Sequence, residues 1–445
     1  MRQIASFVER YSQHFQVHRR NMSHRAHEYI KGLLQAERRN MEKMAEVVTN
    51  TDEQALQQFL SDSPWDYQAV MDQVAGDVNR LLGGRDSALL LDETSIVKKG
   101  RHSVGVARQW CGRLGKVDNC QVGVFSALSK GSEVCLVNAQ LFLPESWHQD
   151  ARRCHKARVP KENQRPQTKS DIALSLVKQA KAQGLDYGWV GADSLYGRDR
   201  SFQRTLDELG EVFMLDIPSN FRIYEEEPQF YRPEPAPRGR KPKRIKTDAT
   251  AIEVQDWIKH QTFRRYTYRA GTKGPLTVEA THQRIWVWDG QSAQARCWHL
   301  VVRKDSEGCI KYSLSNALAK TSLHRLLYMQ GQRHFIERSF QDAKSHLGLD
   351  QYQARNWNAW HHHMALIMMS MVFLLEQRQA HKKEYPLLTV ADMVFIFSHV
   401  LPSRTNGLDQ LLEIVEQRHR KRQKDIERRY TSQQPEHINR WANSG

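Results

Sequence analysis

Apolar residues recur at helical spacing through the first 80 residues of the chain. The first set falls on one helix face and consists of Ile4, Phe7, Val8, Tyr11 and Phe15. The stretch is rich in charge and in Gln and lacks the alternation that marks strands. The sequence therefore predicts a helical N-terminal region that ends at "LLGGRD" and is separate from the rest of the chain.

Short apolar runs replace the helical pattern after residue 85. "SALLLDET" predicts a strand, and "CQVGVFSAL" and "EVCLVNAQLFLP" predict a hairpin with "SKGS" as its turn. "KSDIALSLVKQAKAQG" predicts an amphipathic helix capped by Ser170 or Asp171, and it leads to the strand "GWVGA". A helix over 198–209 and the strand "EVFMLDIP" complete the unit. This succession of strand, hairpin, helix, strand, helix and strand predicts an α/β layer.

The character changes again at residue 219. Pro and charged residues are frequent there, and alternating pieces such as "IWVWDG" and "RCWHLVVRK" predict a β-rich insertion. Helical spacing returns near Ser322 and lasts to about Gln379. Within it, "MALIMMSMVFLL" is shorter than the ~20 residues that span a bilayer, which predicts a buried core helix. The preceding "HHH" cannot hold one ion, since successive helix residues point about 100° apart, and we expect a partly solvated face there.

The net charge indicates which class of partner the protein binds. The 445 residues carry a formal charge of +16, and the sequence pI is about 9.6. Clustered Lys and Arg attract polyanions, so nucleic acid is the first candidate and an anionic membrane surface the second. The six cysteines show no paired ligand spacing, so no zinc site or disulfide framework is expected. The N-terminus lacks the apolar run of a signal peptide, which predicts a cytoplasmic protein.

Three carboxylates are candidate metal ligands: two follow apolar runs and one lies on a helix. Asp92 follows the strand "SALLL" and Asp193 follows "GWVGA", although a lone Asp at such a place most often caps a turn. In "RHFIERSFQDAKSHLG", helical spacing puts Arg333, Glu337 and Lys344 on one face. Alone, that face indicates an ion pair worth only about 0.2–0.5 kcal/mol. Together the three acids can meet at one sheet edge, where oxygen ligands suit Mg²⁺ or Mn²⁺.

In these stretches the sequence resembles the DDE transposases of bacterial insertion sequences, in the group with a Tyr-Arg-Glu-Lys signature and a β-rich insertion before the catalytic Glu. Arg333, Glu337 and Lys344 match the signature at the family spacing, while Gln330 occupies the position of its Tyr, with Tyr328 close by. The blocks around the two aspartates are similar too: Asp92 is followed by Thr94, and Asp193 by Tyr196 and Gly197. So is "SVGVARQWCGRLGKVDNCQVGV". The resemblance covers roughly residues 85–380.

The resemblance implies a fold and an active site. The fold would be α/β, with a ribonuclease H-like core interrupted by a β-rich insertion and flanked by helical N- and C-terminal regions. Asp92, Asp193 and Glu337 would be the catalytic residues and would hold two Mg²⁺ ions, for which Mn²⁺ would substitute. Arg333 and Lys344 would contact the DNA strand at the cleavage site, and Tyr196 is assigned to DNA binding with them.

The implied function is metal-dependent cleavage and strand transfer at the ends of the protein's own element. Its partners would be the terminal inverted repeats and target DNA, both double-stranded, with no membrane. We expect a homodimer, because two ends of the element must be paired. We expect the protein in the bacterial cytoplasm, associated with the nucleoid. The predicted domains are a DNA-binding helical region, the first part of the core, the insertion, the second part of the core with the Glu helix, and a basic helical region, over 1–80, 81–218, 219–325, 326–380 and 381–445.

Further DNA contacts are expected outside the core. Arg238, Arg240 and Lys241 lie in "RGRKPKR", a basic run suited to a narrow minor groove, with a solvated linker as the alternative. The insertion tryptophans Trp286, Trp288 and Trp298 are expected mostly in the core, although in related transposases one such tryptophan stacks on an unpaired base. The C-terminal "EQRHRKRQKDIERR" suits phosphate contacts or a solvated face.

Two other functions fit parts of the sequence. A catalytically inactive, transposase-derived DNA-binding protein would explain the charge but not the complete set of acids. A metal-dependent phosphoesterase for small substrates would explain the acids but not the basic charge.

Overall fold

The first 82 residues are mostly helical. The computed structural model describes residues 2–233, 244–271, 274–305, 307–404 and 407–442. The N-terminal elements are α1 (Arg2–Glu9), a 3₁₀ helix (Ser12–Phe15), β1 (Gln16–Val17), β2 (Arg20–Asn21), α2 (Ser23–Gln35), α3 (Met41–Val47), α4 (Glu53–Ser61) and α5 (Tyr67–Leu82). The predicted apolar face is buried, but α1 ends at Glu9, so Tyr11 and Phe15 reach the core from a turn and the 3₁₀ helix.

Five strands form the central sheet, and they are β3 (Gly84–Val97), β5 (Lys116–Lys130), β6 (Glu133–Phe142), β7 (Tyr187–Ala192) and β8 (Phe213–Ile217). β5 runs antiparallel to both β3 and β6, whereas β7 is parallel to β3 and β8 is parallel to β7. The spatial order is therefore β6-β5-β3-β7-β8, which is the ribonuclease H-like arrangement, and the predicted fold class is confirmed. β4 (Ala107–Cys111), which pairs with the start of β5, was not predicted from the sequence.

Helices cover this sheet. The segments after β6 are α6 (Glu145–His148), α7 (Ala151–Lys156), a 3₁₀ helix (Lys161–Asn163), α8 (Lys169–Ala182), α9 (Ser194–Gly197) and α10 (Arg200–Glu208). α8 packs on β3, β5 and β6. Its N-cap is Thr168, not Ser170 or Asp171 as predicted. Thr168 accepts a hydrogen bond from the Asp171 backbone N–H while the Asp171 carboxylate accepts one from Thr168, a reciprocal cap in which Asp171 is the third helical residue.

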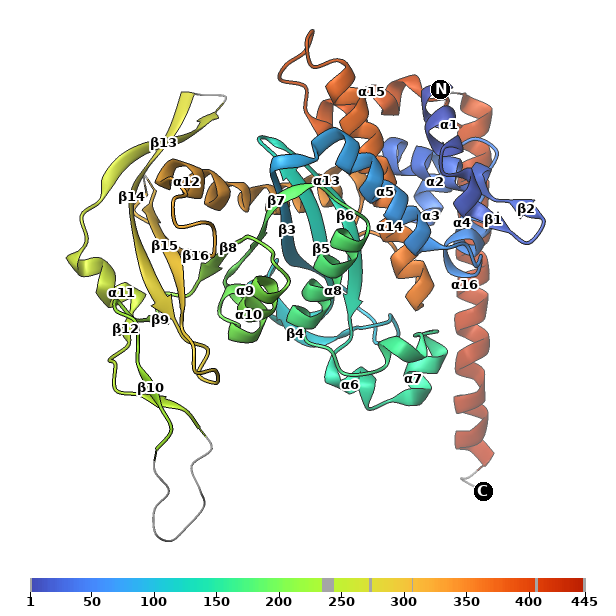
Figure 1. Cartoon of the computed structure of the whole chain (residues 1–445). Coiled ribbons are helices and arrows are strands. Elements are labelled where there is room, and N and C mark those ends of the chain that lie inside the picture. Colours follow the sequence, from blue (N-terminus) through green and yellow to red (C-terminus); the bar gives the residue numbers. More distant parts are fainter. Residues whose placement is uncertain (1, 234–243, 272–273, 306, 405–406, 443–445) are drawn as a thin grey trace.

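The β-rich insertion extends the same sheet. Its elements are β9 (Arg222–Ile223), β10 (Phe230–Tyr231), β11 (Lys246–Thr247), β12 (Ile252–Glu253), α11 (Val254–Trp257), a 3₁₀ helix (Ile258–His260), β13 (Arg264–Gly271), β14 (Gly274–Val287), β15 (Arg296–Lys304) and β16 (Ile310–Ser315). β16 pairs with β8, so β13 to β16 continue the core into one sheet of ten strands. Figure 1 shows the insertion on one side of the core and the N-terminal helices on the other. The predicted domain boundaries stay predictions.

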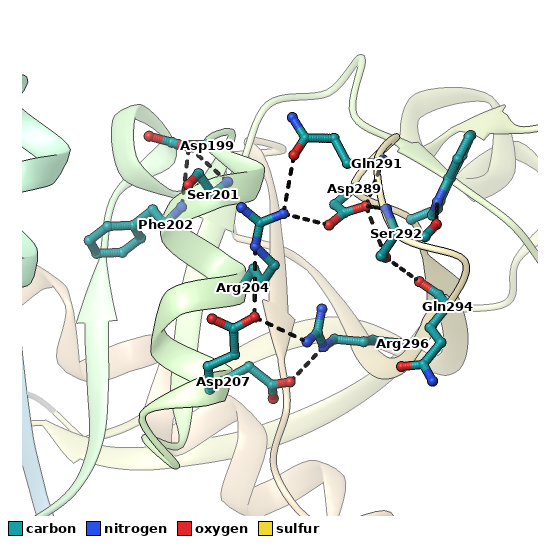
Figure 2. A network of polar contacts seen from close by, with 12 residues as sticks. Asp199, Ser201, Phe202, Arg204, Asp207, Asp289, Gln291, Ser292, Gln294 and Arg296 are labelled. Atoms are coloured by element: carbon teal, nitrogen blue, oxygen red, sulfur yellow. Dashed lines mark hydrogen bonds and ion pairs between the residues drawn. The ribbon is translucent and has the colours of Figure 1, made fainter. Parts of the chain in front are cut away.

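Ion pairs fix the insertion to α10 (Figure 2). The Arg204 guanidinium lies 2.8 Å from the Asp289 carboxylate, in the turn after β14. Arg296, at the start of β15, reaches back to Asp207 of α10 at 2.7 Å. In one pair the Arg belongs to α10 and in the other it belongs to the insertion. The two pairs together fix the orientation of the insertion relative to α10.

The last helices join the two ends of the chain. They are α12 (Leu323–Gln332), α13 (His334–Leu347), α14 (Trp357–Ala380), α15 (Val390–Val400) and α16 (Leu408–Ala442). α14 contains the predicted core helix, which is buried from Met364 to Leu375. It contacts α2, α4 and α5, and the N-terminal helices share one hydrophobic core with the sheet. They do not stand apart from the core as expected.

The histidines of α14 also correct the sequence analysis. His361, His362 and His363 are all buried, not partly solvated. They point in different directions into packed surroundings, and each has a hydrogen-bond partner, so none lies on an open face. Within the described residues, no helix combines the length and apolar character needed to cross a bilayer.

Candidate active site

Three aspartates lie in register at the rim of three neighbouring strands. The parallel pairing of β3 with β7 ends at Leu91 and Ala192, and β7 is in register with β8 at Ala192 and Leu215. The next residue along each segment is Asp92, Asp193 or Asp216. Asp92 is not at the end of its strand as predicted, because β3 continues to Val97 in its pairing with β5. The carboxyl ends of parallel strands are where open α/β sheets place ligands, and here the register brings three acids to that edge.

Asp193 has both roles that its position suggests. It is the N-cap of α9, where Oδ1 accepts a hydrogen bond of 2.9 Å from the Leu195 backbone N–H. The same side chain lines a cleft of about 700 Å³. A turn cap occupies one carboxylate oxygen and fixes the direction of the other. The predicted cap and a ligand role are therefore compatible.

The cleft also receives Glu337. Asp92, Asp193 and Glu337 line it together with Lys344. Glu337 comes from α13, whose apolar stripe of Ile336, Phe340, Ala343 and Leu347 is buried as predicted. That stripe holds α13 against β3 and β5, with the Phe340 ring edge-on to Phe125 at 5.3 Å. The structure therefore brings the three predicted acids into one cleft.

Arg333 connects these acids. Its side chain is 15% exposed and lies 2.7 Å from Glu337, 2.8 Å from Asp216 and 4.0 Å from Asp92. The pair with Glu337 is the intrahelical one that the spacing indicated. The other two contacts join different elements, so Arg333 acts as a positioning residue that links the helix to the strand rim rather than as a group on the surface.

Asp216 and Glu93 were missed by the sequence analysis. Asp216 accepts a hydrogen bond from Ser313 at 2.6 Å, and Ser313 in turn accepts one from the buried Gln330 at 2.8 Å. Gln330, which replaces the signature Tyr, thus supports the strand-end acid from behind. Asp216 ends an apolar run as Asp92 and Asp193 do, so the signal that identified those two was present.

Glu93 also lines the cleft and forms a second link there. Its carboxylate lies 2.8 Å from the Lys169 ammonium and accepts a hydrogen bond of 2.9 Å from Tyr196. Tyr196 is fully buried, so its hydroxyl serves Glu93 in this structure and is not presented to DNA. Lys344 lines the cleft, and its ammonium donates to Thr94 at 2.7 Å.

Negative charge is concentrated at this rim. Burial and the charge of Asp193 raise the pKa of Asp92 well above its ordinary value, and burial and the charge of Glu93 raise that of Asp193. Glu337 is different: the neighbouring His334 and the Arg333 guanidinium hold its pKa at about 2. The cleft therefore keeps two partly buried aspartates whose charges are costly without a nearby cation.

This donor set suits a divalent metal ion. The acids offer only oxygen ligands, which Mg²⁺ and Mn²⁺ prefer. A bound cation would also stabilise the ionised forms of Asp92 and Asp193, which burial and neighbouring negative charges disfavour. Among the described residues, however, no three acidic, His or Cys side chains stand close enough to hold one ion in this conformation. Glu337 is engaged by Arg333, so a metal that used it would compete with the guanidinium.

Other predicted DNA contacts lie in the insertion and in the C-terminal basic run, where Arg418 and Lys421 form ion pairs with Glu46 and Glu53. Arg238, Arg240 and Lys241 lie outside the described residues. Trp298 is buried and packs edge-on against Phe213, and Trp288 donates a hydrogen bond to the Ser292 carbonyl. The backbone of Trp286 pairs with that of Tyr224.

Comparison with known proteins adds a family to this geometry. The family model described as DDE superfamily endonuclease matches residues 10–275, more than half of the chain and including both predicted aspartates. The chain belongs to the DDE superfamily endonucleases. The predicted resemblance is thereby confirmed at the level of the family.

The similarity to individual proteins covers less of the chain or is weaker. This DDE endonuclease is 31% identical over 187 residues to the probable transposase for insertion sequence element IS701 of Microchaete diplosiphon. The match takes in 42% of this chain and spans about half of the relative, 46% of its length. Among solved structures, the piggyBac transposase synaptic complex with hairpin DNA is similar with a TM-score of 0.39 and 10% identity, over 90% of this chain and 77% of that one. The NurA nuclease of Sulfolobus solfataricus follows with a TM-score of 0.24 and 9% identity, over 72% and 94%. Both structural likenesses are weak.

Proposed function

We propose that this DDE endonuclease is the transposase of a bacterial insertion sequence and that it cuts and joins DNA at the ends of its own element. The observation that carries the proposal is the register of Asp92, Asp193 and Asp216 at one rim, with Glu337 from α13 in the same cleft. The basic charge of the chain fits a DNA substrate, since phosphates are bound by Lys and Arg with release of counterions.

The metal would be Mg²⁺, in two ions held by Asp92, Asp193 and Glu337, with Mn²⁺ as a substitute. When bound, such ions supply an activated water or 3′-hydroxyl and stabilise the leaving oxygen of a phosphodiester. The chain itself contributes the positions of the acids. Asp193 is oriented by its bond to the Leu195 N–H, and Arg333 holds Glu337 against the strand rim.

Lys344 is the cation placed for the DNA strand. Its ammonium is fixed by Thr94, two residues beyond Asp92 on the same strand, so it lies beside the acids and not on a mobile surface. Burial lowers its pKa, and a phosphate arriving in the cleft would favour its charged form. Arg333 would turn from its carboxylates to the strand only after a metal has taken its place. The partners would be the terminal inverted repeats and target DNA, bound by a homodimer.

Asp193→Asn tests the proposal because it separates charge from shape. Asn keeps the size and remains a good N-cap, so the bond to Leu195 and the fold should survive. The anion that a hard cation needs is lost, so cleavage of element ends in Mg²⁺ should fall by several orders of magnitude while DNA affinity stays unchanged. A nicking assay on DNA carrying the element ends, together with a binding assay, measures both.

Asp199→Asn is the matched control. Asp199 caps α10 through bonds to the Ser201 and Phe202 N–H groups and lies outside the acid cleft. Its substitution should leave cleavage near the wild-type rate. A folded Asp193→Asn protein that still cut element ends like the wild type would overturn the assignment of this residue and leave Asp193 as a cap alone.

A further inference from the structure

A second lysine lies in the acid cleft. Lys169 is the first residue of α8, and its side chain lines the cleft together with Lys344. Its ammonium lies 2.8 Å from Oε1 of Glu93, while Oε2 of Glu93 accepts the hydrogen bond from Tyr196. None of the roles assigned above uses the charge of Lys169.

The ion pair with Glu93 leaves Lys169 able to bind a further group. An ammonium has three N–H donors, and the hydrogen bond to Glu93 uses one of them. The Lys169 side chain is 22% exposed, so it is held in place and is still open to the cleft. A side chain that is already held loses little rotamer entropy when it binds a phosphate.

The two lysines come from opposite faces of the sheet. Glu93 pairs with Lys169, and the next residue of β3, Thr94, accepts a hydrogen bond of 2.7 Å from Lys344. Successive residues of a strand point to opposite faces, so α8 brings Lys169 from one face and α13 brings Lys344 from the other. Both nevertheless line one cleft with the acids. The cleft therefore reaches around the rim of the sheet, with a cation supplied from each face.

The space continues beyond Lys169. This residue also lines a second cavity, of about 800 Å³, whose walls include Phe142 and Leu195. The two aspartates of that cavity, Asp171 and Asp199, accept hydrogen bonds from backbone N–H groups at the starts of helices. A polymer that lies across the acids can thus pass Lys169 and continue, whereas a small anion would occupy one of the two spaces only.

We propose that Lys169 is a second phosphate-binding residue of the cleft and that it contacts the DNA strand on the opposite side of the scissile phosphate from Lys344. This deepens the proposed function and rests on DNA being the substrate. With the scissile phosphate at the acids, Lys344 meets a phosphate on one side of it and Lys169 meets a phosphate on the other. The alternative is that Lys169 only neutralises Glu93 and fastens α8 to β3, without touching DNA.

Replacing single phosphates of the DNA tests the proposal. The probes are duplexes that carry an element end, each with one uncharged methylphosphonate linkage near the cleavage site, and binding is measured without metal. The wild type should lose affinity about tenfold when a contacted phosphate is neutralised, the order expected for one hydrogen bond between charged groups. Lys169→Gln should bind the unmodified duplex about tenfold more weakly and should lose nothing further at one linkage, because that contact is already absent. Lys344→Gln should be insensitive at a linkage on the other side of the cleavage site.

Two further variants separate a DNA contact from a structural role. Lys169→Arg keeps the charge and should retain most of the wild-type pattern. If Lys169 served only as the partner of Glu93, then Glu93→Gln and Lys169→Gln would change binding alike. The proposal instead expects Glu93→Gln to keep the sensitivity of the wild type at every linkage. Lys178→Gln is the matched control, since Lys178 is an exposed lysine of the same helix that lines neither cavity.

A Lys169→Gln protein that responds to every neutral linkage as the wild type does overturns the proposal, as does a wild type that responds to none on that side. Because binding is measured without metal, the result does not depend on catalysis. A wild type that shows the Lys169 contact but does not cut element ends in Mg²⁺ would refute the transposase activity and leave the contact standing. A wild type that cuts but lacks the contact would do the reverse.

Discussion

At the scale of single residues, the acids of the cleft are held by partners that lie far from them in the chain. Asp92 and Asp193 were found because each follows an apolar run, and the structure places both at one rim. Glu93 could not be found in this way, because strand alternation assigns only one of two successive residues to the cleft, whereas both Asp92 and Glu93 line it. The link from Arg333 to Asp216 joins residues 117 positions apart, 333 minus 216, and helical spacing carries no information on it.

Arg333 gives the first residue-scale prediction, on metal binding. Its guanidinium supplies positive charge to Asp216, Glu337 and Asp92, as a metal would. Arg333→Gln should lower the free energy of unfolding without metal by about 1–3 kcal/mol, the cost of removing charge-assisted hydrogen bonds from partly buried acids. The variant should then gain more thermal stability from Mn²⁺ than the wild type does, because the metal no longer displaces a cation.

Thermal unfolding with and without Mn²⁺ measures this difference. Arg325→Gln is the control, since Arg325 forms an ion pair of 2.6 Å with Asp86 outside the cleft. It should leave the metal-dependent gain as in the wild type. An Arg333→Gln protein that gained no more from Mn²⁺ than the wild type would show that the guanidinium and the metal do not compete.

At the scale of elements, long regular segments were predicted and short or long-range ones were not. β5 and β6 were predicted from continuous apolar runs and α8 from helical periodicity, whereas β4 is a five-residue strand in which polar residues interrupt any such run. That the insertion joins the core sheet through β16 and β8 was not predictable either, since the pairing depends on tertiary contact and not on local pattern. One long-range contact does involve a residue of the stretch "GWVGADSLYG": its last residue, Gly197, approaches the backbone of Asp216.

Gly197 lets α9 approach β8. A Cβ at this position would stand 1.8 Å from the backbone oxygen of Asp216, and backbone cannot move aside as a flexible side chain can. Gly197→Ala should therefore lower the free energy of unfolding by about 1–3 kcal/mol, as overpacking does, and should shift Asp193 relative to Asp216. Urea unfolding and DNA cleavage are the measurements, and both should decrease.

Gly76→Ala is the opposite case in the same chain. It lies inside α5, where an added Cβ would meet nothing within 4 Å beyond the adjacent residues and the helix's own backbone, so Ala should stabilise the protein by about 0.5–1 kcal/mol through helix propensity. If Gly197→Ala were as stable and as active as the wild type, the close approach of α9 to β8 would not be a constraint on the site.

At the scale of the whole molecule, the N-terminal helices and the core are one body, which the sequence did not reveal. An apolar stripe shows that a helix must be buried but not what it is buried against. Within this shared apolar core, two histidines of α14 also hydrogen-bond to the N-terminal region. His363 accepts from or donates to the Tyr29 hydroxyl at 2.9 Å, and its other nitrogen faces the Gly348 carbonyl at 3.2 Å. Since a carbonyl only accepts, the neutral ring protonated at Nε2 satisfies both bonds.

This arrangement makes the whole fold sensitive to acid. Burial, with the charge of Lys98 adding to it, lowers the pKa of His363 to about 3, and the ring of Tyr352 stacks on it at 4.9 Å. In the unfolded chain the pKa is about 6.5, so the stability that His363 contributes is complete above pH 6.5 and is lost as the pH falls from there toward 3. Each buried histidine of this kind should lower the free energy of unfolding by about 1.4 kcal/mol for each pH unit in that window.

His363→Gln, whose amide can replace both bonds, should show a shallower fall in urea unfolding free energy with decreasing pH than the wild type. His399→Gln, on the exposed side of α15, should keep the wild-type slope. A His363→Gln slope equal to that of the wild type would mean that this histidine does not link the N-terminal helices to the core through its neutral form.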